Sequence, residues 1–334
     1  MRRPLLSVSL IASLVVVGLA IGVQSKALTL VPPSIEYTTD PGKKIETTVK
    51  LFNEASTPVT VTVTTANFGA KGETGEPDFK FDAATADLAS WIKPGQSQLT
   101  LAAGERVTVP VTISVPANAD PGGHYAGIFF GSGGSATDSG QVAIQSKLGT
   151  LVILRVEGEI RETATVASFG TKDKKTSYSN LPVTFEFRVS NTGNVHIRPQ
   201  GTVLIKNLFG GESATFNLND VNGAVLPNSI RAFDVTWKKL AATNKRSNFF
   251  QKIGNEWKNF ALGPYTATAS VTYGQTKQNL VATARVTVMP WELLIVMALV
   301  IAGVILLIVF GVRAYNTAII RRAESKLPPP SGLR

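Results

Sequence analysis

The 334-residue chain has no cysteine and only two histidines, His124 and His196. It can therefore form no disulfide, no catalytic Cys–His pair and no zinc site built from cysteine and histidine. It also lacks any Asn-X-Ser/Thr glycosylation sequence. Exported eukaryotic domains commonly carry disulfides, so for an exported chain these absences favour a bacterial cell surface, where packing alone supplies stability.

Charged residues are missing from Leu293 to Val312, a run of about twenty mostly aliphatic residues. A helix of this length covers the core of a bilayer, roughly 30 Å. A buried helix of a soluble protein is the alternative, but such a helix usually keeps a polar face, and this run has none. We predict a transmembrane helix over residues 291–312.

Basic residues mark both ends of the chain. Arg2 and Arg3 precede the apolar run Leu5 to Val23, which is typical of a signal peptide. We assign the signal peptide to residues 1–27, with an uncleaved anchor as the alternative. Residues 313–334 form a basic tail, which the positive-inside rule places in the cytoplasm. We therefore expect a single-pass protein of the cell membrane with its N-terminal ectodomain outside.

The formal net charge of +10 does not indicate a nucleic-acid partner. Much of the surplus lies in the signal peptide and the tail, where it reflects membrane topology. Most of the remainder lies between Lys238 and Lys258. No extended basic face is left, so no nucleic acid is expected as a partner.

Residues 28–158 alternate between apolar and polar types in short runs separated by Pro, Gly and Asn. Examples are Ile45 to Leu51, Val59 to Val63 and Val107 to Val115. A period of two residues is typical of half-buried strands. Six or seven such strands predict an immunoglobulin-like antiparallel β-sandwich, which we call domain one.

Residues 159–290 repeat the pattern and form domain two. Val183 to Val189 alternates, Asn191 to Asn194 makes a turn, and Phe233 to Trp237 alternates again. The predicted fold class is therefore all-β, with two immunoglobulin-like antiparallel β-sandwich domains, a signal peptide and one C-terminal transmembrane helix.

Several motifs occur in a recognisable order along domain one. They are Val31-Pro32-Pro33, Pro41-Gly42, Trp91-Ile92, Leu99 to Glu105, Val115 to Tyr125, and Leu148 to Leu151. Their succession resembles the N-terminal domain of the WxL-interacting proteins, which are membrane-anchored surface proteins of Gram-positive bacteria. The resemblance implies two β-sandwich domains, the first associated with peptidoglycan binding and the second with a protein partner. The expected partners are thus a cell-wall polymer or a surface protein.

The insert 238–260 in domain two departs from that family because it is longer and more basic than a strand connection requires. Its apolar residues gather on one side of a short helix: Phe249, Phe250, Ile253, Trp257 and Phe260. One interpretation is that this side packs on its own domain. The other is that it contacts the outer leaflet or an anionic wall polymer. In the second case Phe249, Phe250, Trp257, Lys245, Arg246 and Lys252 would be the binding residues.

Domain one offers Trp91 as a further binding candidate, because an exposed tryptophan can stack on a sugar ring. Packing at the edge of the sandwich core is the favoured interpretation. Residues 67–94 are predicted to be one long loop and a recognition surface. Their acidic residues are expected to be solvated: Glu73, Glu76, Asp78, Asp82 and Asp87.

The sequence contains no recognisable catalytic constellation. Gly131 to Ser135 is not a phosphate loop, because no Lys-Ser/Thr follows it. We expect no enzyme activity, cofactor, metal or small-molecule substrate. The predicted function is a membrane-anchored bacterial surface protein that binds cell-wall glycan, a surface protein or both. The alternative is an envelope assembly accessory, or chaperone-like protein, that uses β-strand complementation.

Overall fold

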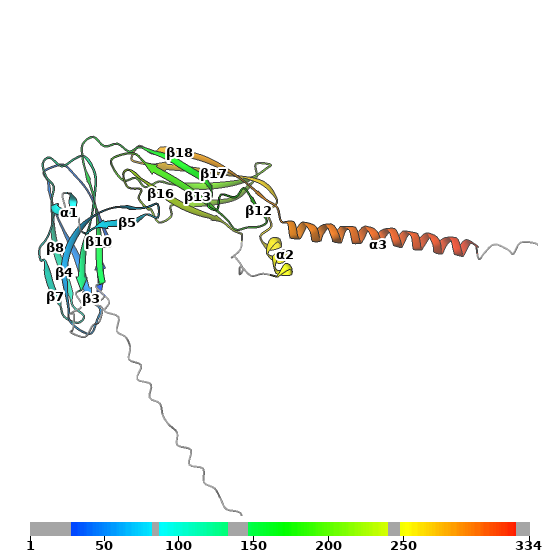
Figure 1. Ribbon diagram of the computed structural model, residues 1–334, viewed down its shortest axis with the longest axis horizontal. Coiled ribbons are helices and arrows are strands. Elements are labelled where there is room, and N and C mark those ends of the chain that lie inside the picture. Colours follow the sequence, from blue (N-terminus) through cyan, green and yellow to red (C-terminus); the bar gives the residue numbers. More distant parts are fainter. Residues whose placement is uncertain (1–27, 82–86, 133–145, 240–247, 325–334) are drawn as a thin grey trace, which may run out of the picture.

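The computed structural model describes residues 28–81, 87–132, 146–239 and 248–324. These residues form two β-sandwiches followed by one long helix (Figure 1). The predicted signal peptide, Lys245, Arg246 and Asp82 lie outside the described residues. The predicted fold class is confirmed, with the two departures in strand direction described below.

The first sandwich consists of two sheets. One has the order β1 (Leu28–Val31), β3 (Lys44–Asn53), β8 (Arg106–Ser114), β6 (Ile92–Pro94). The other has the order β2 (Ser34–Thr39), β10 (Ser146–Val156), β9 (Gly122–Ser132), β4 (Val59–Lys71), β5 (Glu76–Lys80), with β7 (Gln98–Leu101) also on β4. The short helix α1 (Leu88–Trp91) closes one side.

The alternation seen in the sequence places one face of each strand in the core. Val49, Val111 and Ile113 point inward from the first sheet, and Ile128 and Phe130 point inward from the second. All five are almost fully buried, as a period-two pattern predicts for a sandwich.

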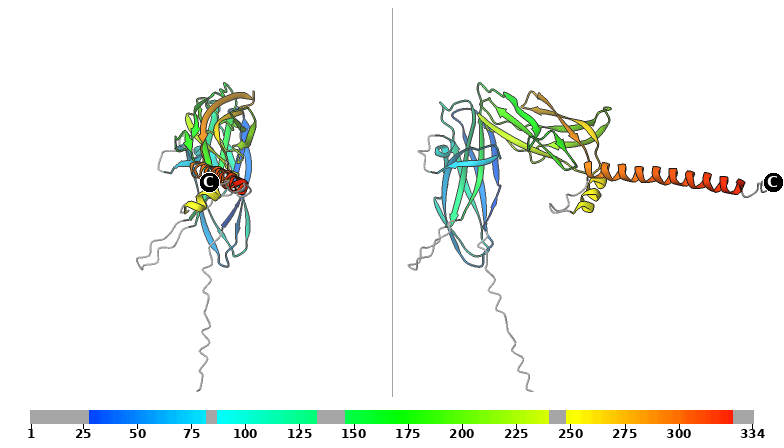
Figure 2. Two further views of the ribbon diagram at one scale, coloured as in Figure 1. Left: turned by 90° about the vertical axis from the view of Figure 1, so that its right-hand side faces the viewer. Right: turned by 45° about the vertical axis from the view of Figure 1, so that its right-hand side comes forward.

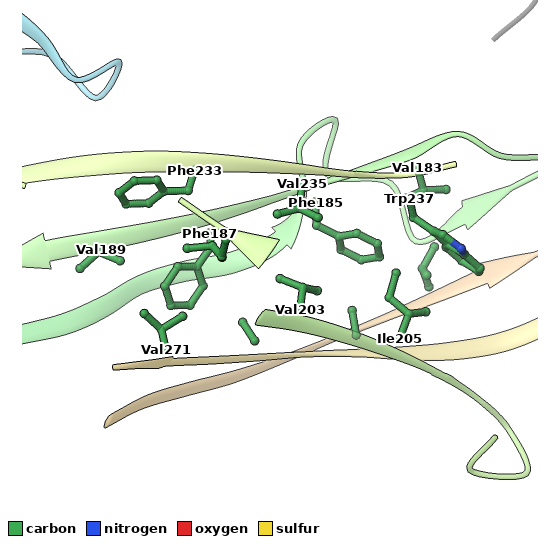
Figure 3. Packing of buried hydrophobic residues seen from close by; sticks show 14 of the residues in the cluster. Val183, Phe185, Phe187, Val189, Val203, Ile205, Phe233, Val235, Trp237 and Val271 are labelled. Carbon is green, nitrogen blue, oxygen red and sulfur yellow. The ribbon is translucent and has the colours of Figure 1, made fainter. Parts of the chain in front are cut away.

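The second sandwich also has two sheets. The smaller has the order β11 (Ala164–Thr171), β13 (Val183–Asn191), β16 (Ser229–Trp237). The larger has the order β12 (Ser177–Tyr178), β18 (Gln278–Val288), β17 (Gly263–Tyr273), β14 (Gln200–Asn207), β15 (Glu212–Leu218). Figure 3 shows Phe185, Phe187, Val203, Ile205 and Trp237 packed between the sheets.

Two strand pairs are parallel, although the sequence predicts purely antiparallel sheets. β2 runs parallel to β10, and β12 runs parallel to β18. In domain one the chain leaves the first sheet after β1 and joins the second as β2. There it lies at the edge, beside the last strand of the domain and in the same direction.

Residues 67–94 are not one long loop, so that prediction is wrong. They complete β4 and form β5, α1 and β6, with only residues 82–86 undescribed. The β4–β5 hairpin is held by cross-strand pairing in which Phe68 lies opposite Phe79. Aromatic cross-strand pairs stabilise a hairpin even where its other residues are acidic or glycine.

The C-terminal part contains two helices, α2 (Phe249–Lys258) and α3 (Trp291–Glu324). Among the described residues, α3 is the one helix long and apolar enough to cross a membrane. Its 34 residues correspond to about 51 Å at 1.5 Å per residue, so it extends well beyond the predicted span. α2 packs against α3.

Candidate binding surface between the two domains

Ion pairs join the two sandwiches across the angle that they form (Figure 1). Glu36 on β2 accepts a hydrogen bond of 2.8 Å from Arg198 of domain two. Glu73, at the tip of the β4–β5 hairpin, accepts two hydrogen bonds from the Arg188 guanidinium, one of 2.6 Å from Nε. Bidentate arginine–carboxylate pairs fix direction as well as distance.

Main-chain contacts reinforce this junction. The backbone N–H of His196 donates to the Tyr125 hydroxyl at 2.8 Å, and that of Gly123 donates to the Asn194 carbonyl at 2.8 Å. The backbone N–H of Ala232 donates to the Glu73 carbonyl at 3.0 Å, which ties the hairpin to β16. The angle between the domains is therefore held at several separate points.

The hairpin approaches domain two closely because its turn contains glycine. Gly75 has a φ of 81°, in the left-handed region. A Cβ at this position would lie 2.1 Å from Cζ of Arg231. A side chain at Gly75 would therefore be strained by this φ and would displace the Arg231 guanidinium.

Burial and neighbouring charges set the protonation of the junction. Burial, together with the positive charge of Arg198, lowers the pKa of His196, so this imidazole is neutral at pH 7. Burial by itself would raise the pKa of Glu36, but the hydrogen bond and charge of Arg198, together with a hydrogen bond from His196, lower it. The Glu36 carboxylate is therefore ionised, and the junction keeps its charge pair at neutral pH.

A cavity of about 200 Å³ lies in the angle between the domains. Phe68, Leu151 and Ile153 line it from domain one. Ile230 and Arg231 line it from domain two. Nε of Arg231 is buried without a hydrogen-bond partner, although another guanidinium nitrogen donates to the Ala224 carbonyl at 2.7 Å. The cavity is thus mostly apolar.

An aromatic cluster continues from this cavity along the outward face of the larger sheet of domain one. The ring centroids of Phe68 and Phe79 are 5.4 Å apart, and those of Phe79 and Phe129 are 4.7 Å apart. Phe81 packs on Phe129 at 4.9 Å and is 45 % exposed. Gly127 makes room for the cluster, because a Cβ there would lie 2.7 Å from the Phe129 ring. We call these four phenylalanines the aromatic platform.

β2 borders the cavity and lies at the edge of its sheet. Among the described strands it pairs with β10 alone. The carbonyls of Pro33 and Thr39 accept hydrogen bonds from β10, so by alternation the main chain of Glu36 faces the other way. An edge strand with unpaired main-chain groups is a template for a further strand.

Trp91 lies elsewhere, at the end of α1. It is half-buried, packs against the core of domain one and has its ring 4.7 Å from that of His124. This position agrees with the favoured interpretation of edge packing, and sugar stacking stays a prediction. Nδ1 of His124 is 2.6 Å from Asp87, and Nε2 is 2.9 Å from the Asp120 carbonyl.

Two of the five acidic residues expected to be solvated make specific contacts, whereas Glu76 and Asp78 pair only with surface lysines. Glu73 binds Arg188 of the other domain, and Asp87 binds His124. The described residues contain no group of three His, Asp or Glu side chains that could hold a metal ion.

The other predicted binding residues that the structure describes lie on α2, beside the start of α3 (Figure 1). Phe249, Phe250 and Trp257 are 51 %, 81 % and 68 % exposed, and Lys252 is also exposed. The interpretation that this apolar side packs on its own domain is therefore wrong for these three residues.

Sequence reasoning missed the surface between the domains. Its members come from β2, β4, β5, β9 and β10 and from domain two, so only strand register brings them together. One local signal exists: Phe79 and Phe81 alternate with polar residues, and Phe129 follows Gly127 by two.

No known protein family and no curated protein matches the chain. Solved structures with a similar arrangement include the class 5 fimbriae chaperone CfaA, at 10 % identity and a TM-score of 0.40, covering 77 % of this chain and 99 % of that one. The Salmonella enterica SafA pilin in complex with the SafB chaperone is similar at 8 % identity and a TM-score of 0.34, covering 78 % of this chain and 97 % of that one. The Acinetobacter baumannii CsuC–CsuE chaperone–tip adhesion subunit complex is similar at 13 % identity and a TM-score of 0.33, covering 62 % of this chain and 89 % of that one. TM-scores at this level do not establish a shared function.

Proposed function

We propose that this chain is a non-enzymatic, membrane-anchored protein that holds an extended segment of another exported protein in the angle between its two domains. The observation that carries the proposal is the unpaired edge of β2 beside the apolar cavity. The occupant adds a strand along β2 and places apolar side chains in the cavity, whose wall includes Ser34 of β2 and Leu151 and Ile153 of the neighbouring β10.

An extended protein segment fits this surface better than a sugar polymer. Main-chain hydrogen bonds from β2 require a partner with a regular row of amide groups, and the cavity is lined mainly by aliphatic and phenyl groups. Contiguous exposed apolar surface of this kind marks interaction sites.

The rigidity of the junction supports the same function. A binding site shared by two domains loses affinity when the domains move independently, because ordering them costs free energy on binding. Here Glu73, Glu36 and Tyr125 each contact domain two, so the two walls of the site are held in place before the partner arrives.

We further propose that α3 crosses the membrane with Arg321 and Arg322 on the cytoplasmic side and both sandwiches outside. The basic residues after the apolar run support this orientation through the positive-inside rule. The resemblance to the WxL-interacting proteins remains a prediction, and so does binding to cell-wall polymer.

Site-specific photo-crosslinking in intact cells tests the binding site. A photoreactive residue at Ser34, which is exposed on β2 and lines the cavity, should give a crosslink to one exported protein, identified by mass spectrometry. The matched control is Val281 on β18, which is also exposed but lies in the other domain. A crosslink to cell-wall polymer alone, or the same products from both positions, would contradict the proposal.

Amide exchange then tests the mode of binding with the purified partner. Strand addition predicts slower exchange of the outward-facing β2 amides, including that of Glu36, when the partner is bound. Binding without any protection of β2 would show that the partner is not held as an added strand.

A further inference from the structure

α2 is fixed to the first turn of α3 by a buried carboxyl group. Glu256 is 1 % exposed, and its Oε2 accepts a hydrogen bond of 2.7 Å from the backbone N–H of Leu293. This N–H belongs to the start of α3, where a helix presents unsatisfied donors. Burial and the neighbouring Glu292 raise the pKa of Glu256 to about 7, so the hydrogen bond and not a full charge makes this contact. Lys252 lies 3.9 Å from Glu292 and adds a second contact.

The direction of α2 differs from that of α3. Figures 1 and 2 show α2 beside the beginning of α3 and running across its axis. If α3 crosses a bilayer, a helix in this position lies close to the plane of the membrane surface.

The outer side of α2 exposes large aromatic side chains at this level. Phe249, Phe250 and Trp257 are all exposed, as is Trp291 in the first turn of α3. Lys252 and Lys258 are exposed on the same helix. Aromatic rings with neighbouring lysines are typical of helices that lie in the interface between water and lipid.

A second segment presents apolar side chains at the same end of domain two. Leu208 and Phe209, at the tip of the β14–β15 hairpin, are 69 % and 92 % exposed. Strand register pairs Asn207 with Tyr265 and Gly263 with Val288, three residues before α3 begins. The hairpin tip therefore lies at the end of the sandwich from which α3 starts, although it is far from α2 in sequence.

We propose that the exposed side of α2 and the tip of the β14–β15 hairpin insert into the outer-leaflet interface of the membrane that α3 crosses. This inference rests on the proposed membrane anchoring by α3. The occupant of the apolar surface is lipid, because the surface is continuous with the start of the span through the Glu256–Leu293 hydrogen bond. Domain two then meets the membrane at two separate places, which holds its orientation instead of leaving it to swing on one helix.

The absence of cysteine makes this inference directly measurable, since any introduced cysteine is the only one in the chain. Spin labels are placed singly at Phe250, Phe209, Val281 and Ile305 of the full-length protein, reconstituted into vesicles of phosphatidylglycerol and phosphatidylethanolamine. Power-saturation measurements compare collisions with oxygen, which enriches in lipid, and with a water-soluble nickel chelate. All four native side chains are exposed, so the labels leave the core intact.

The expected result is a graded series. The label at Ile305 reports the bilayer interior, those at Phe250 and Phe209 report the interface with about tenfold less collision with the nickel chelate than Val281, and Val281 reports water. The inference would be overturned if the labels at Phe250 and Phe209 were as accessible to the chelate as the label at Val281. If the label at Ile305 were still in lipid, the anchoring by α3 would stand. A water-exposed Ile305 would overturn the anchoring itself and the inference with it.

A paired variant separates lipid contact from contact with a protein. In Phe250→Ser/Trp257→Ser, the label at Phe209 is measured again in the same vesicles. Lipid contact predicts that Phe209 gains access to the nickel chelate, because the domain loses one of its two membrane contacts. An unchanged Phe209 signal would show that α2 does not hold the domain at the membrane.

Discussion

At the scale of single residues, His124 connects α1 to the start of β9. Burial alone would lower the pKa of His124, but hydrogen bonds with Asp87 and with the Asp120 carbonyl raise it above the ordinary 6.5. A group whose pKa is raised on folding stabilises the fold below its unfolded pKa, and this contribution is lost as the pH rises through the folded pKa. The urea midpoint of domain one unfolding should therefore fall as the pH is raised through this interval.

The variant His124→Gln keeps a hydrogen-bonding side chain but cannot be protonated, and it serves as the matched control. Its urea midpoint should change less with pH across the same interval. Equal slopes for the parent and the variant would show that the Asp87–His124 pair does not stabilise the protonated form.

Phe187 gives the residue-scale prediction for packing. It is 1 % exposed and lies between the two sheets of domain two. Phe187→Ala leaves a cavity and removes apolar contacts, so it should lower the free energy of unfolding by about 3 to 5 kcal/mol, measured by urea titration. Val221→Ala, at an 82 % exposed position, should change it by about 0.5 kcal/mol or less.

At the scale of elements, the β4–β5 hairpin acts as an arm from domain one to domain two. Glu73→Gln removes the charge that Arg188 binds, while the Ala232–Glu73 main-chain hydrogen bond remains possible. Such partly exposed pairs contribute little to stability, so the variant should speed amide exchange at Ala232 by only about 1.4- to 5-fold.

Exchange in the core strand β13 provides the internal control for this variant and should not change. Arg188→Gln should speed exchange at Ala232 to a similar extent, and the double variant should add little. Additive effects of the two substitutions would mean that each acts through some other contact.

The elements that the sequence predicted well are those with strong local signals. The alternation of apolar and polar residues predicted β3, β8 and β13. The spacing of the aromatic residues predicted the helix α2, with these residues on one side of it. The partner of α2 was not predictable, because a buried glutamate, Glu256, makes the contact with α3 and an apolar period does not reveal it. The hairpin was read as a loop because its glutamates and glycines hid the Phe68–Phe79 pair. The parallel edges depend on where β2 and β12 lie after folding, and no local pattern encodes that.

At the scale of the whole molecule, the site depends on the angle between the domains, and the angle depends in part on His196. The charged groups around its imidazole are Arg198, Glu36 and Arg155. Burial and the arginines outweigh the attraction of Glu36 and lower the pKa of His196. For a pKa lowered on folding, the stabilisation is present above the unfolded value of 6.5 and is lost as the pH falls through the folded value. Acidification should therefore loosen the junction.

Distances between spin labels measure this loosening. With single cysteines introduced at Thr48 and Val281, both exposed and in different domains, the distance distribution should broaden between pH 7.5 and pH 5. His196→Gln stays neutral at both pH values, so its distribution should be nearly independent of pH. Because the junction shapes the binding surface, partner affinity should fall over the same interval in the parent and not in His196→Gln. Equal broadening in both proteins would place the acid sensitivity at another group and remove His196 from the control of the angle.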